Sequence, residues 1–99
     1  MAVDTRLKGS EVVVRNEDRL LTTTVDDELV GLSIDQGVCY GLNVVGTRIW
    51  ALIATPRSID SLCDELLSEF DVEADECRQE VIELLEALRT EGLVTVRAA

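Results

Sequence analysis

Three cysteines are the side chains best suited to nucleophilic chemistry in this chain, and they stand far apart at Cys39, Cys63 and Cys77. A thiol nucleophile is usually activated by a histidine, and the sequence contains none. The odd number of cysteines argues against a disulfide framework, and no Cys-x-x-Cys pair indicates zinc. We therefore expect three small buried hydrophobes, and we predict no catalytic residue, metal site or cofactor. The alternative, a thiol hydrolase using one of these cysteines, has no supporting motif.

Acidic residues dominate the charge. There are 20 Asp and Glu against 9 Lys and Arg, a net charge of −11. This balance opposes nucleic-acid binding, which depends on neutralising phosphates. It suits attraction of a basic partner, or it simply keeps the chain in solution.

The expected location of the protein follows from the lack of a membrane-spanning segment and of a secretory signal in the sequence. No apolar run approaches the roughly 20 residues that span a bilayer. The first residues lack the basic-then-apolar order of a secretory signal. We predict a cytoplasmic protein with no membrane partner.

A chain of 99 residues, 46% of them hydrophobic, is expected to fold as one domain with a modest core. We divide it into a loose N-terminal segment, residues 1–11, and a single domain, residues 12–97. Residues 12–14 and 93–96 are expected to be short extended segments at the two ends of that domain.

The first half of the domain has the pattern of an antiparallel β-meander. Strands are predicted at 20–25, 29–34 and 38–42, because these segments are rich in β-formers or alternate in hydrophobicity. Residues 26–28 have turn composition, and 35–37 read as a hairpin loop with glycine at a positive-φ position. A meander leaves its first and third strands as edges. One face of the second strand is expected to carry Val30, Leu32 and Ile34.

Three helices are predicted to follow. Asn43 is a natural N-cap for a helix over 44–54, which Pro56 ends. Ser58 caps a second helix over 59–69. The third runs over 74–91, with Gly92 at the C′ position. The element order predicts an α+β fold.

The third helix carries two apolar features. At about 100° per residue, one stripe is expected to face the core, and its members are Cys77, Val81, Leu84 and Leu88. The apolar arc widens on one side through Ile82 and Leu85, which share their flank with Asp75, Arg78 and Arg89. This flank either meets another part of the core or lines a binding groove. The opposite flank, with Glu76, Glu80 and Glu83, is expected to be solvated.

The segment "DQGVCYGLNVVGTRIWALI" resembles the strand–turn–helix motif of the PqqD-like proteins, the RiPP recognition elements. The matching positions are Gly37, Tyr40, Leu42, Asn43, Gly46, Ile49 and Trp50. The later Phe-Asp-Val, long helix and Gly-Leu-Val also fit, so the resemblance covers residues 20–96. One departure is Glu73, where family members often carry Asp.

The resemblance implies a winged-helix-like fold, a three-stranded antiparallel sheet packed on three helices. It also implies a non-catalytic protein that binds the leader segment of a precursor peptide. The leader adds as a strand to the third strand and packs against the third helix. Carried over residue by residue, the strand edge is Val38, Cys39, Tyr40, Gly41 and Leu42. The helical wall is Asp75, Arg78, Gln79, Ile82 and Leu85.

The "YGLN" form is most similar to recognition proteins of lasso-peptide biosynthesis, whose partners are a leader peptidase and a macrolactam cyclase. Tyr40 either packs on the helices or flanks the leader, whereas Trp50 is expected in the core.

Two other functions are weighed against this reading. One is a PqqD-type peptide chaperone for a radical SAM enzyme, which differs only in its partners. The other is a winged-helix DNA-binding regulator, which the acidic third helix disfavours. An open strand edge also allows either a monomer or an edge-paired or swapped dimer.

Overall fold

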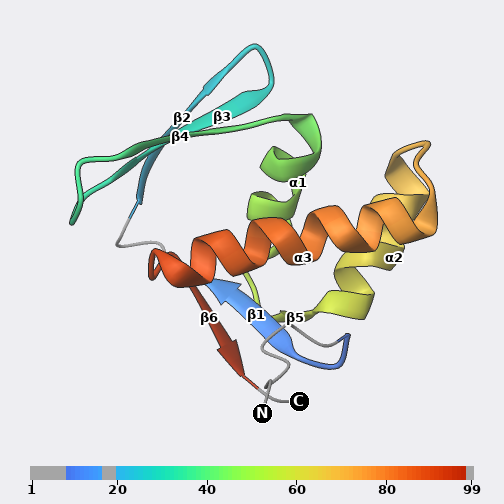
Figure 1. Cartoon of the computed structure of the whole chain (residues 1–99). Helices are drawn as coiled ribbons and strands as arrows, with labels where there is room; N and C mark the ends of the chain where they lie inside the picture. The colour runs from blue at the N-terminus through green and yellow to red at the C-terminus, as the bar shows by residue number, and fades with distance from the viewer. Residues whose placement is uncertain (1–8, 17–19, 98–99) are drawn as a thin grey trace.

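The computed structural model describes residues 9–16 and 20–97. Residues 1–8 of the predicted loose segment lie outside this range, and the boundary at residue 12 stays a prediction. The described residues form three helices and two three-stranded sheets, arranged as Figure 1 shows. The elements are β1 (Val12–Arg15), β2 (Leu20–Val25), β3 (Glu28–Ser33), β4 (Cys39–Leu42), α1 (Val44–Leu52), β5 (Arg57–Ser58), α2 (Ile59–Glu69), α3 (Ala74–Thr90) and β6 (Val94–Arg97).

The predicted meander is confirmed as the antiparallel sheet β2-β3-β4, at the top of Figure 1. A two-residue turn joins β2 to β3, and both of its residues have positive φ, 51° at Asp26 and 67° at Asp27. Such a turn matches the natural twist of a hairpin. Gly37 has a φ of 67° in the next loop. The predicted α+β, winged-helix-like fold is confirmed. Its meander is closed by turns at the positions that the sequence indicates.

A second sheet, β5-β1-β6, was not predicted as a sheet. The predicted extended segments at the two ends of the domain pair here, with Val13 opposite Val96. Val13 is completely buried. Because the paired segments are far apart in the sequence, their alternation gives no clue to their pairing.

The helix caps follow the predicted chemistry. The Asn43 side chain accepts a hydrogen bond from the Gly46 N–H at 2.8 Å, and the Ser58 hydroxyl accepts from the Ser61 N–H at 3.1 Å. Glu73 makes no side-chain cap bond to α3. Gly92 follows α3 with a φ of 74°, a conformation that glycine adopts without strain. Within the described residues, no helix is both long and apolar enough to cross a membrane.

The single tryptophan anchors the core, as predicted. Trp50 is buried. The Arg15 guanidinium lies over its ring, 5.3 Å from the centroid, and donates to the Trp50 carbonyl at 3.0 Å. This arrangement ties β1 to α1 through a cation–π contact and a hydrogen bond.

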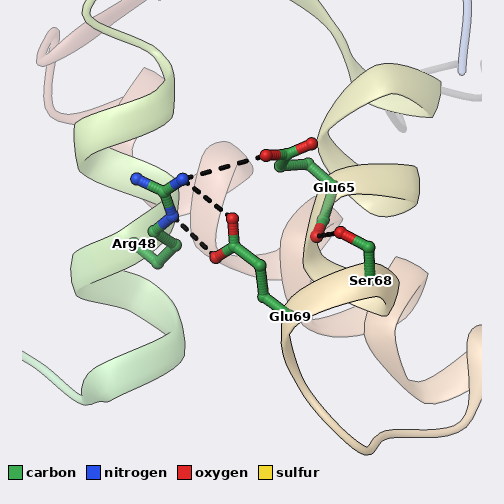
Figure 2. Close-up of polar contacts among 4 residues, drawn as sticks. All are labelled: Arg48, Glu65, Ser68 and Glu69. Carbon is green, nitrogen blue, oxygen red and sulfur yellow. Dashed lines mark hydrogen bonds and ion pairs between the residues drawn. The ribbon is translucent and has the colours of Figure 1, made fainter.

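An ion pair joins α1 to α2, as Figure 2 shows. The Arg48 guanidinium donates to both carboxylate oxygens of Glu69, at 2.7 and 2.8 Å. Glu65 lies 3.8 Å away and adds a second negative charge. The hydrogen bond from Arg48 is the main reason that the pKa of Glu69 lies below its usual value.

The predicted apolar face of β3 points away from the helices. Val30, Leu32 and Ile34 are exposed, whereas Leu29 and Ser33 are buried on the opposite face. The odd-numbered and the even-numbered residues each lie on one face, so either series fits a strand pattern. The alternation predicts a strand, but it does not identify the face that the helices cover.

The core stripe of α3 is also shifted from the prediction. Leu85 is completely buried, and Leu84 is only partly buried against the core. On the same flank of α3 as Leu85, Arg78 is hydrogen-bonded to Asp60 of α2, so that flank faces the helical core. Leu85 is therefore a core residue, and its place in a leader-binding wall stays a prediction.

We predict that Leu85→Ala lowers the free energy of unfolding by about 2–5 kcal/mol, as expected for a buried leucine. Leu84→Ala removes the same atoms from the neighbouring, partly exposed position and should cost less than half as much. Denaturant unfolding of the two variants tests this. Equal losses would contradict the assignment of Leu85 to the core.

We predict that Glu69→Gln destabilises the protein most at neutral pH. A carboxylate whose pKa is lowered by folding stabilises the native state above its unfolded pKa, about 4.3. That contribution is lost as the pH falls through the lower native pKa. The difference in melting temperature from wild type should therefore shrink below about pH 4. Glu73→Gln is the matched control, and an equally pH-dependent difference there would refute the assignment to the Arg48 pair.

Candidate functional site

Strand β4 has one strand neighbour, β3, among the residues that the structure describes. The Ser33 N–H donates to the Val38 carbonyl at 2.8 Å, which fixes the phase of the β3–β4 ladder. Hydrogen-bonded and non-hydrogen-bonded pairs alternate along an antiparallel ladder. The backbone N–H and C=O groups of Cys39 and Gly41 therefore point away from β3, toward the outer edge of the sheet.

The start of α1 holds the end of β4 in place. The Thr47 hydroxyl donates to the Leu42 carbonyl at 3.1 Å and accepts from the Leu29 N–H at 2.8 Å. One side chain of the helix thus bridges the last pair of the β3–β4 ladder. The position of the strand edge is consequently fixed relative to α1.

A groove runs between the end of β4 and α3, with α1 as its floor. Its volume is about 430 Å³. In Figure 1, β4 and α3 run across the view on either side of this region. The lining residues are Gly41, Leu42, Asn43, Val45, Gly46, Ile49, Glu80, Glu83 and Leu84. The groove thus combines a backbone edge, an apolar floor and a polar wall.

A glycine allows the three elements to approach closely. A Cβ atom at Gly46 would lie 3.3 Å from the Leu42 Cβ and 3.5 Å from the Leu84 Cδ2. The first contact is tighter than side chains normally accept, so a larger residue would push β4 or α3 outward. This explains a glycine at the position that the sequence motif singles out.

Tyr40 links β4 to the C-terminal end of α3. It is half-buried against the core and lies near Glu91, the residue that follows α3. Partial burial, with a smaller effect of the Glu91 carboxylate, raises the pKa of Tyr40. Of the two roles left open for Tyr40, the structure places it on the helical side of the sheet.

Most residues of the predicted helical wall do not line the groove beside β4. Arg78 is hydrogen-bonded to Asp60 on α2, and Ile82 packs partly buried on the core. Asp75 is exposed but does not line the groove. Gln79 borders a smaller adjoining cavity of about 200 Å³, together with Glu76, Glu80 and Glu83.

The wall that faces β4 belongs to the flank expected to be solvated. The prediction followed the wider apolar arc of α3, but α2 packs on α3 and pairs with Arg78 on that side. Glu80, Glu83 and Leu84 take its place. Val45, Gly46 and Ile49 were also missed as groove residues, although two of them lie in the motif that carries the family resemblance. Of the predicted strand edge, Gly41 and Leu42 line the groove. Cys39 on β4 and Val38 just before it are exposed.

The thiols differ in their access to solvent. Cys63 and Cys77 are buried, and burial raises the pKa of both. A raised pKa lowers the fraction of reactive thiolate. The expectation of burial is wrong for Cys39, which is exposed on the outer face of β4. In the described part of the chain, no group of three or more acidic or cysteine side chains is arranged to hold a metal ion.

Fold and groove together define a small α+β protein with an open strand edge beside a helix. The family model "Coenzyme PQQ synthesis protein D (PqqD)" matches residues 28–94, well over half of the chain. The chain belongs to the PqqD family, which confirms the resemblance inferred from the sequence.

A solved structure supports the same placement. The chain is similar to the structure "TbiB1 in Complex with the TbiA(beta) Leader Peptide", with 27% sequence identity and a TM-score of 0.72. The match covers 87% of this chain and 99% of that one. No curated protein matches the chain.

Proposed function

We propose that this protein binds the leader segment of a precursor peptide by strand addition to β4. The observation that carries this proposal is the outward-facing backbone of Cys39 and Gly41 next to a groove between β4 and α3. An added strand gains backbone hydrogen bonds from the edge, and its alternate side chains enter the groove. The similar TbiB1 structure contains a leader peptide, which supports this class of ligand.

The geometry of the groove supports a set of binding residues. Cys39 and Gly41 offer main-chain donors and acceptors, with Val38, Tyr40 and Leu42 completing the strand. The apolar floor receives inward-pointing side chains of the leader. Of the wall carried over from the family, only Gln79 borders this region.

The protein acts by tethering and performs no chemistry. A bound leader holds the rest of the precursor at a high local concentration for a processing enzyme, so the later step becomes effectively intramolecular. We propose a leader peptidase and a macrolactam cyclase as the recipients, in a lasso-peptide pathway. The cytoplasmic location and the choice between monomer and edge-paired dimer stay predictions from the sequence.

A chaperone for a radical SAM enzyme is the second candidate. The description of the family as a coenzyme PQQ synthesis protein favours it. Both candidates use the same groove, and they differ in the enzyme that receives the peptide. Binding assays of the loaded protein with each enzyme class distinguish them.

We predict that Gly41→Pro abolishes leader binding, because proline removes an N–H that pairs with the guest. The β3–β4 ladder should survive, since that N–H points away from β3. The assay is fluorescence titration with the labelled leader of the precursor encoded beside this gene. We expect saturable binding by wild type and at least a tenfold loss in the variant.

Thr22→Pro is the matched control. The two-residue turn makes Val25 and Glu28 a hydrogen-bonded pair, so the N–H of Thr22 points outward from the far edge of the same sheet. It should bind like wild type. If Gly41→Pro bound normally with an unchanged circular dichroism spectrum, strand addition at β4 would be wrong.

A further inference from the structure

The wall of the groove on α3 is negatively charged. Glu80 and Glu83 line the groove directly, and both also line the adjoining cavity with Glu76 and Gln79. Among residues 9–16 and 20–97, no lysine or arginine lines either cavity. The carboxylates therefore face the place of the guest without a cation from the lining residues.

The arginines near this part of the fold are engaged elsewhere. Arg48 pairs with Glu69 and Glu65 between α1 and α2, and Arg78 pairs with Asp60 on α2. Arg89 pairs with Glu86, on the side of α3 away from Glu80. The negative wall is consequently not neutralised by these side chains, and its charge is complementary to a cation on the guest.

The floor beside the wall is apolar. Leu42, Val45, Ile49 and Leu84 come from three different elements and meet in the groove. A guest side chain entering here is removed from water against carbon atoms, which favours an aliphatic or aromatic residue. Acidic wall and apolar floor thus select two different side chains.

The spacing of these two features fits an extended peptide. Glu80 and Leu84 are four residues apart on α3, a rise of about 6 Å along the helix axis. Side chains on one face of a strand recur every two residues, about 6.6 Å apart. A strand that runs along β4 and α3 can therefore place one side chain on Leu84 and the next inward-pointing one on Glu80.

We infer that the groove selects leader segments with a Lys or Arg two positions from a large apolar residue, both pointing toward α3. The basic side chain pairs with Glu80 and Glu83, and the apolar one packs on the floor. This inference rests on the proposed function and names the chemistry of its ligand.

The test is selection from a bacterial display library of random 12-residue peptides. Wild-type protein should enrich Lys or Arg at least threefold over the unselected library, two positions from an apolar residue. The double variant Glu80→Lys/Glu83→Lys should instead enrich Asp or Glu at that position. Asp64→Lys/Asp71→Lys carries the same net charge and should select like wild type, because neither residue lines the groove.

A second measurement uses the most enriched peptide, made synthetically. Its affinity for wild type should fall about tenfold between 50 and 500 mM NaCl, because partly exposed ion pairs are screened by salt. The fall should be at most threefold for Glu80→Gln/Glu83→Gln.

Gly41→Pro distinguishes a failure of strand addition at β4 from a failure of the basic preference alone. It keeps the charge of wild type, so enrichment of the same basic peptides by both proteins would reveal non-specific attraction and overturn strand addition as well. Peptides that depend on Gly41 but show no basic preference would overturn the present inference alone. An unchanged preference in the double lysine variant would also overturn it.

Discussion

The junction between β4 and α1 is the constraint on which the site depends. Asn43 ends the strand and caps the helix, and Thr47 bridges the last pair of the β3–β4 ladder. Gly46 lets Leu42 and Leu84 approach across the first turn of α1. These contacts fix the outer edge of β4 relative to the floor of the groove. A binding edge held in this way loses little conformational entropy when a guest arrives.

The strand edge and the groove contribute differently to the proposed binding. A strand edge offers the same backbone groups to any peptide, so by itself it gives affinity without selectivity. In the binding mode we propose, the side chains of the groove beneath the edge supply the selectivity. Separating these tasks suits a protein that must recognise one segment of a precursor and leave the rest of that peptide accessible.

The sequence predicted the parts of the fold that depend on local chemistry. The caps at Asn43 and Ser58, the glycine after α3 and the burial of Trp50 all follow from residue types at fixed positions. The family motif added the adjacency of β4 and α3, which periodicity alone cannot supply.

The errors arose where tertiary packing decides between equivalent faces. Val30 and Leu29 lie on opposite faces of β3, and only the position of the helices determines which face is buried. Likewise, the apolar arc of α3 is wide enough to reach either neighbour. Because Leu85 is buried in the core and Arg78 pairs with α2, the acidic flank faces β4. From the sequence, a charged flank of a helix is expected to be solvated. Only the tertiary structure shows that this flank lines the groove.

The most direct test of strand addition is amide hydrogen exchange, residue by residue, by NMR with and without the leader peptide. The account predicts that the amides of Cys39 and Gly41 exchange quickly in the free protein and are protected at least tenfold in the complex. Those of Tyr40 and Leu42, which face β3, should change far less. Saturated binding with no added protection at Cys39 and Gly41 would contradict the account.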